Sequence, residues 1–126
     1  MKIERLDHLV LTVADVNATT AFYSKAMGMT PVTFGPGRHA LAFGQQKINL
    51  HPGQSPVKPH AAHPSPGSAD LCFITSEPIA DVITHPARAG VPIDQGPVAR
   101  TGAMGPITSV YFRDPDGNLI EVSRYE

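Results

Sequence analysis

The sequence predicts an α+β fold built from two copies of a strand–helix–three-strand (βαβββ) module. Similar segments recur 62 residues apart, turn residues divide the chain into short elements, and a proline-rich stretch separates the two halves. The chain has 126 residues, 41% of them apolar and 17% charged, which suits one folded domain. We expect a single domain over residues 1–126, with modules at about 1–52 and 68–126 joined by a connector at about 53–67.

Each module opens with an apolar strand followed by a helix. The first strand covers Leu9–Val13, and Asp15 is a favourable N-cap for a helix over residues 16–27 that ends at Gly28. The counterparts are a strand over residues 71–74 and a helix over about 78–89, in which Pro86 predicts a kink or early fraying. Because the same 62 residues separate Gly28 from Gly90 and His8 from Asp70, the two modules align here without a gap.

Three further strands are predicted to close each module. They lie at residues 30–34, 39–43 and 46–51 in the first module and at 92–95, 107–113 and 118–124 in the second. The residues around Arg100 to Gly105 are expected to form an inserted glycine-rich loop, and Asp114-Pro115-Asp116-Gly117 supplies the last hairpin turn. Aligning the final strands makes Asn49 equivalent to Glu121.

Composition excludes several classes of function. A formal net charge of −1 and the absence of tryptophan argue against nucleic-acid binding. The N-terminal apolar run is too short for a signal peptide or a membrane span, and no glycine-rich nucleotide fingerprint is present. The single cysteine, Cys72, cannot form an internal disulfide and suits a cytoplasmic protein. We expect a small-molecule substrate, with no nucleic acid and no membrane as partner.

The segments DHLVLTV, FYSKAMGM and DPDGNLIEV resemble the vicinal oxygen chelate superfamily of glyoxalases, bleomycin-resistance and fosfomycin-resistance proteins and extradiol dioxygenases. The resemblance covers essentially the whole chain. The chain most resembles the subgroup of glyoxalase domain-containing protein 5 and similar bacterial virulence-associated proteins. The segments that carry this likeness are AHPSPGS and GPVARTGAMGPITSVYFRDPDGNLIEVSRY. It implies a curved, barrel-like mixed sheet around a cavity, a divalent metal in that cavity, and a homodimer whose cavity lies within one chain or is shared by two.

The resemblance implies metal ligands at four equivalent positions, occupied here by His8, Asn49, Asp70 and Glu121. Asp70 stands where the family commonly has a second histidine, and Asn49 stands where glyoxalases carry glutamate. One imidazole and two carboxylates can bind a divalent cation, with Mn²⁺ or Fe²⁺ favoured and Ni²⁺, Zn²⁺ and Mg²⁺ left open. The alternative is a hydrogen-bonded polar cluster without metal.

The glyoxalase reaction needs a base, and the amide of Asn49 cannot accept a proton. Glu121 is therefore one candidate catalytic residue, and His51 is the other because it projects from the same face of its strand as Asn49. Lys47 and Arg100 are candidates for holding a carboxylate or phosphate of the substrate. The alternatives are a strand-end surface position for His51 and solvated side chains for Lys47 and Arg100, while Cys72 is expected to pack in the core.

The resemblance thus implies a metal-dependent lyase or isomerase of the glyoxalase type, acting on a small oxygenated substrate. A metal-free ligand-binding protein similar to the bleomycin-resistance group is the alternative, kept open by Asn49 and Asp70. An Fe²⁺-dependent extradiol-type dioxygenase is less favoured, because Asp70 replaces the second histidine of those enzymes.

Overall fold

The computed structural model describes residues 1–126 and contains the two predicted βαβββ modules. The first module consists of β1 (His8–Val13), α1 (Val16–Met27), β2 (Thr30–Phe34), β3 (Arg38–Phe43) and β4 (Gln46–Pro52). The second consists of β5 (Asp70–Ile74), α2 (Ile79–Arg88), β6 (Gln95–Gly102), β7 (Gly105–Arg113) and β8 (Leu119–Tyr125). The predicted α+β class and element order are confirmed.

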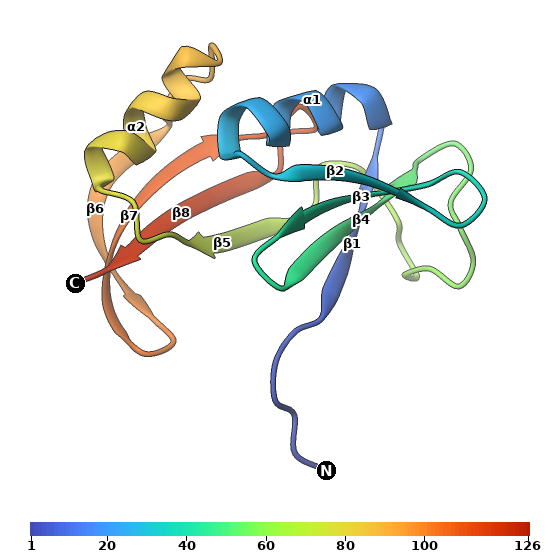
Figure 1. Ribbon diagram of the computed structural model, residues 1–126, viewed down its shortest axis with the longest axis horizontal. Coiled ribbons are helices and arrows are strands. Elements are labelled where there is room, and N and C mark those ends of the chain that lie inside the picture. Colours follow the sequence, from blue (N-terminus) through green and yellow to red (C-terminus); the bar gives the residue numbers. More distant parts are fainter.

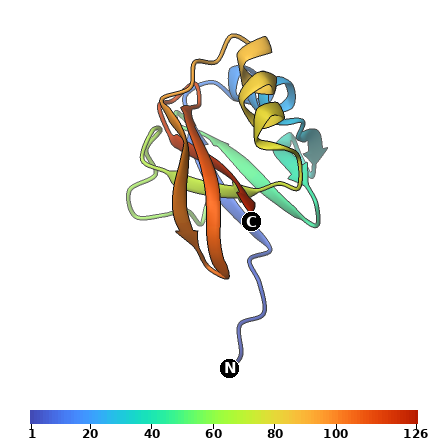
Figure 2. The ribbon, with the colours of Figure 1, turned by 90° about the vertical axis from the view of Figure 1, so that its left-hand side faces the viewer.

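Each module forms its own four-stranded mixed sheet, in the orders β1-β4-β3-β2 and β5-β8-β7-β6. The first and last strands of each module pair in parallel, and the other neighbours pair antiparallel. Both helices lie on the same side of the strands (Figure 1), and the view from the end shows the curvature of the second sheet beneath α2 (Figure 2). No strand pairing joins the two sheets, so the barrel-like arrangement does not close into a barrel within one chain.

The strand registers confirm that the two modules are structural repeats. Asn49 lies opposite Val10 in the β1–β4 pair, and Glu121 lies opposite Cys72 in the β5–β8 pair. Val10 and Cys72 are equivalent under the 62-residue offset of the opening strands, so the equivalence of Asn49 with Glu121 holds in three dimensions.

Helix α1 has the predicted caps. The Asp15 carboxylate accepts the Ala18 N–H at 3.0 Å, and Gly28 ends the helix in the left-handed conformation with φ of 68°. Helix α2 has Pro78 at its N-terminus, and the buried Pro86 lies in its final turn. Neither helix is long and apolar enough to cross a lipid bilayer.

The inserted loop predicted around Arg100 to Gly105 is reduced to a turn at residues 103–104, because the residues on either side of it belong to strands. Residues 95–102 form β6, in which Arg100 pairs with Ile107 and Gly102 with Gly105. The Gly96-Pro97 sequence is typical of a loop, but here it occupies a bulge between Gln95 and Val98, after which pairing with β7 resumes. Gly96 has φ of 114°, and a Cβ there would lie 2.5 Å from the Ser109 carbonyl oxygen, so only glycine fits.

One apolar core joins the two modules between the helices and the sheets. Its fully buried members are Leu11, Val13, Tyr23, Met29, Leu41, Ile48, Leu50, Phe112 and Ile120. The Tyr23 hydroxyl donates a 2.7 Å hydrogen bond to Oδ2 of the buried Asp114. Burial raises the pKa of Tyr23, and the negative charge of Asp114 adds to the shift. This bond ties α1 of the first module to the β7–β8 turn of the second.

Replacing Tyr23 with phenylalanine removes that hydroxyl without a large change of volume. We expect the free energy of unfolding to fall by about 2 kcal/mol, because hydrogen bonds to a buried charged group contribute more than neutral ones. Chemical denaturation measures the change. The matched control is Tyr125→Phe, whose hydroxyl accepts only the exposed Met104 N–H at 3.1 Å. Equal unfolding midpoints for the two variants would contradict the role of the Tyr23–Asp114 bond.

Candidate functional site

Strand alternation places the predicted first-module residues on one face of their sheet. On β1 and β4 the side chains that enter the core are Leu11, Val13, Ile48 and Leu50. The opposite face therefore carries His8, Lys47, Asn49 and His51. We call this the first open face. No helix of its own module covers it, because α1 packs against the other side (Figure 1).

The second sheet follows the same pattern. The side chains of Leu71, Phe73, Ile120 and Val122 pack towards the core, so Asp70, Cys72 and Glu121 lie on the opposite face, the second open face. The prediction that Cys72 packs in the core is wrong. Its side chain is exposed, because β5 lies at an edge of its sheet and this face has no covering element.

A cavity of about 430 Å³ lies on the second open face and brings Asp70 and Glu121 together with the predicted substrate-binding residue Arg100. The other residues that line it are Asp94, Gln95, Tyr111, Arg113 and Leu119. Arg113 is already paired with Asp94 at 3.0 Å, whereas neither Asp70 nor Glu121 has a cationic partner. The cavity therefore offers two carboxylates that are free to bind a cation.

Two buried serines hold the Glu121 carboxylate. Ser109 Oγ donates to Glu121 Oε2 at 2.6 Å, and Ser123 Oγ donates to the same oxygen at 3.2 Å. The two hydroxyls also lie 2.7 Å apart, and both residues are fully buried. Because these bonds engage one carboxylate oxygen and fix the side chain, Glu121 enters the cavity in a preorganised position with its second oxygen available.

Arg100 is positioned by Tyr111 rather than by a flexible loop. Its Nε donates to the Tyr111 hydroxyl at 3.1 Å, and its guanidinium carbon lies 5.5 Å from the centre of that ring. Tyr111 itself lies opposite Glu121 in the β7–β8 pair. The pair therefore brings a guanidinium and a phenol to the wall beside Glu121, where they can bind a substrate oxygen.

On the first open face, His8 is oriented by its neighbour. Asp7 Oδ2 accepts the His8 Nδ1–H at 2.7 Å, and this hydrogen bond lowers the pKa of Asp7. In the neutral imidazole this bond places the proton on Nδ1, which leaves the Nε2 lone pair that a metal ligand needs. The His8 side chain is 45% exposed, so a ligand or a second protein chain can reach it.

His51 is buried, with 3% of its surface exposed, so it is not a strand-end surface residue. Arg38 Nη2 donates to His51 Nε2 at 3.3 Å. Burial lowers the pKa of His51, and the positive charges of Arg38 and His60 lower it further, so the imidazole is neutral at pH 7. Lys47 is also partly buried, with its ammonium 3.9 Å from the centre of the Phe34 ring.

The four predicted metal ligands do not converge within one chain. Asp70 and Glu121 line one cavity, but His8 and Asn49 lie on the other sheet and do not contribute to it. No three carboxylate, imidazole or thiol side chains of the chain come close enough to hold one ion. A single chain therefore presents two half-sites, each with suitable donor atoms, and does not by itself fit a complete metal centre.

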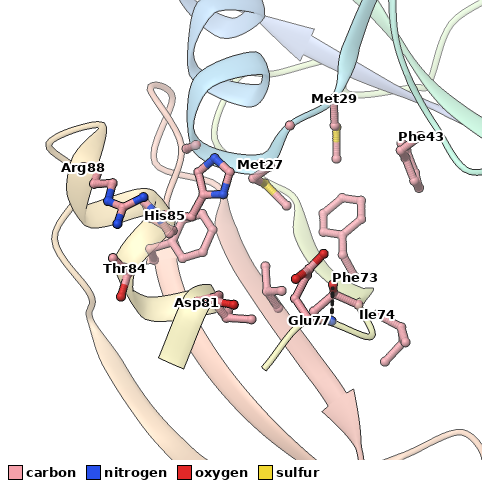
Figure 3. Close-up of a pocket in the computed structure, with 17 residues that line it drawn as sticks. Met27, Met29, Phe43, Phe73, Ile74, Glu77, Asp81, Thr84, His85 and Arg88 are labelled. Carbon is pink, nitrogen blue, oxygen red and sulfur yellow. Dashed lines mark hydrogen bonds between the residues drawn. The ribbon is translucent and has the colours of Figure 1, made fainter. Parts of the chain in front are cut away.

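A larger cavity, of about 650 Å³, lies away from all of these residues, between the C-terminal end of α1, α2 and the end of β5 (Figure 3). Met27 and Met29, at the end of α1, and Phe43 and Phe73, from the sheets, make its apolar wall, and its α2 side carries Asp81, His85 and Arg88. None of the predicted site residues lines it. The sequence did not reveal this cavity because it forms only where the two modules pack together.

Sequence reasoning also missed Arg38, Tyr111, Ser109 and Ser123. The signal for Ser123 was available, since it is two residues from Glu121 and therefore shares its face, whereas Ser109 reaches Glu121 only through the β7–β8 register. Arg38 and Tyr111 act across strand pairs, and their partners depend on registers that local spacing does not reveal.

Comparison with known proteins agrees with this architecture. The profile of the Glyoxalase/Bleomycin resistance protein/Dioxygenase superfamily matches residues 5–122. Virulence protein STM3117 of Salmonella typhimurium is 58% identical over 125 residues, covering 99% of this chain and 87% of that protein. Its crystal structure superimposes with a TM-score of 0.98 at 57% identity over 100% of both chains.

Two further relatives are similar over the full length. The glyoxalase domain-containing protein RDO1 of Mycosarcoma maydis is 51% identical over 126 residues, covering 100% of this chain and 71% of that protein. The integron cassette protein VCH_CASS1 of V. cholerae is 60% identical, with a TM-score of 0.98, and the match covers 100% of this chain and 98% of that one. On the family profile and these relatives, the chain belongs to the glyoxalase/bleomycin resistance protein/dioxygenase superfamily.

Proposed function

We propose that this protein is a metal-dependent lyase or isomerase that binds a small oxygenated substrate at a divalent cation. One observation supports this most directly. Two carboxylates without a cationic partner, those of Asp70 and Glu121, lie in one cavity beside Arg100 and Tyr111. The orientation of His8 by Asp7 adds an imidazole nitrogen suited to a metal. A metal bound by such residues would polarise adjacent substrate oxygens and stabilise an oxyanion.

We propose further that two copies of the chain form a homodimer and complete each site. In this arrangement His8 and Asn49 of one protomer face Asp70 and Glu121 of the partner subunit. Three features support it: the half-sites lie on separate sheets, both faces are open, and the first exposes an aliphatic side chain, Val10, at 43%. The faces are also electrostatically complementary, because carboxylates without a cationic partner lie only on the second.

Within that site Glu121 is the better placed base. Asn49 has no basic atom, and the Nε2 lone pair of His51 already accepts from Arg38. Glu121 has one oxygen engaged by serine hydroxyls and the other available to take and return a proton at a substrate carbon. Arg100 and Tyr111 would hold the oxygen on which negative charge develops.

Proteins that share this fold include one solved with a metal ion and one that binds an antibiotic. The fosfomycin resistance protein FosX of Listeria monocytogenes, solved with Mn(II), shares the fold with a TM-score of 0.70 at 20% identity. TnmS3, an antibiotic-binding protein of Streptomyces, shares it with a TM-score of 0.79 at 21% identity. The amide of Asn49 at a ligand position favours a metal-free binding protein of the second kind as the alternative function.

Elemental analysis of the purified protein, after exposure to Mn²⁺, Fe²⁺, Ni²⁺ or Zn²⁺, tests metal binding. We expect about one ion per chain, lost in His8→Ala and Glu121→Gln because each removes a ligand. His63→Ala and Glu126→Gln change exposed residues outside the site and serve as matched controls. Absence of any bound ion would contradict the metalloenzyme and leave the ligand-binding protein.

Heterodimers distinguish a shared site from one within each chain. His8→Ala and Glu121→Gln chains, co-expressed with different affinity tags and purified as mixed dimers, contain one doubly altered site and one intact site if the sites are shared. We expect about one ion per mixed dimer and almost none in either parent dimer, because a two-fold interface uses each half-site once. Metal-free mixed dimers would place each site within a single chain, and a monomeric protein would rule out the dimer.

A further inference from the structure

A cationic and aromatic cluster occupies the first open face beside Asn49. Two cations pack on the Phe34 ring, with Lys47 Nζ 3.9 Å and the Arg38 guanidinium carbon 4.9 Å from its centre. Arg38 also donates to His51 Nε2 at 3.3 Å. Neither Lys47 nor Arg38 forms a salt bridge, so two positive charges lie on this face without a carboxylate partner.

The same cluster contains polar atoms that are buried and have no hydrogen-bond partner. Six such side-chain atoms occur in the chain, and three of them lie here on β3 and β4: Arg38 Nε, Asn49 Oδ1 and His51 Nδ1. Asn49 and His51 are 5% and 3% exposed. Because buried polar groups in proteins are almost always paired, their concentration on one face indicates a binding site.

The hydrogen bond between Arg38 and His51 identifies which of these atoms are donors. Arg38 Nη2 can only donate, so His51 Nε2 accepts and the proton of the neutral imidazole is on Nδ1. Arg38 Nε is also a donor. The cluster thus combines two unpaired N–H groups with two uncompensated positive charges, and the ligand chemistry that satisfies both is an oxyanion.

We propose that Arg38, Lys47 and His51 form an anion-binding site that takes a carboxylate or phosphate group of a small acidic molecule. The anion site is argued from these contacts alone. Its assignment to the substrate of the neighbouring metal centre rests on the proposed function. Lys47 and His51 each lie two residues from Asn49 along β4, a spacing of about 7 Å. The substrate is therefore a compact acid whose anionic group lies a few bonds from its chelating oxygens.

The test uses the full-length protein freed of metal with a chelator and titrated with inorganic phosphate or malonate at about 0.15 M NaCl, where exposed charges are screened. Nitrogen-15 NMR follows the side-chain N–H signals of Arg38 and His51 and yields the dissociation constant. We expect saturable binding of at least one probe, with both signals shifting together. Linear, unsaturable shifts with both probes would overturn the proposal, and preference for one probe identifies the anion as carboxylate or phosphate.

Variants locate the anion. Arg38→Gln and Lys47→Gln should each weaken binding by about tenfold or more, because each removes a charge-assisted contact. Arg38→Lys keeps the charge but not the planar fork, so it should weaken binding less than Arg38→Gln. Arg124→Gln, at an exposed strand position, is the control and should leave binding unchanged. Loss of binding in Arg100→Gln but not in Arg38→Gln would place the anion on the second open face and refute the assignment.

Because these titrations are done without metal, their outcome is independent of the elemental analysis. A protein that binds the anion through Arg38 but binds no metal would support this site and contradict the metalloenzyme. A protein that binds metal but shows no saturable anion binding would support the metalloenzyme and contradict this anion site. Backbone amide spectra of each variant establish that it is folded, so a loss of binding reports on the site.

Discussion

The relative position of the two modules depends on one buried carboxylate, that of Asp114. Its Oδ2 accepts from the Tyr23 hydroxyl and from Asn118 Nδ2, each at 2.7 Å, and its Oδ1 accepts the backbone N–H groups of Asp116 and Asn118. Four donors satisfy a charge that would otherwise be costly to bury. The β7–β8 turn is thereby rigid and bound to helix α1 of the other module.

The same turn also binds the end of β1 and the start of β5, the edge strands of the two parallel pairs. Asp116 Oδ1 accepts the Ala14 N–H at 3.2 Å, just after β1, and Asn118 Oδ1 accepts the Ala69 N–H at 2.8 Å, just before β5. The network therefore anchors β5 next to Asp70 and anchors β1 at the end opposite His8. Residues that carry no site chemistry thus determine where the site residues lie.

The internal repeat allowed the order of the elements and the positions of several candidate site residues to be predicted from the sequence. Equivalent positions in two modules must share a register: an offset of 62 residues aligns Gly28 with Gly90, and a separate alignment of the final strands, after an insertion in the second module, places Asn49 and Glu121 correctly. The helix caps at Asp15 and Gly28 followed from local chemistry. Features that depend on contacts between strands were not predictable in the same way, because a Gly-Pro bulge conceals β6 and no spacing reveals that Arg38 meets His51.

The resemblance to glyoxalases implies a glutamate at position 49, and the surroundings of Asn49 offer a physical reason for an amide there. Asn49 lies between Lys47 and His51 on β4, on a face that is rich in donors and positively charged, whereas the carboxylates Asp70 and Glu121 share the other face with serine hydroxyls. A carboxylate at position 49 would neutralise the cations that attract an anion. A neutral amide leaves them free and still offers an oxygen ligand. In the proposed site the first open face would bind the anionic group of a compact acid, and the carboxylates of the second would bind the metal that holds its oxygens.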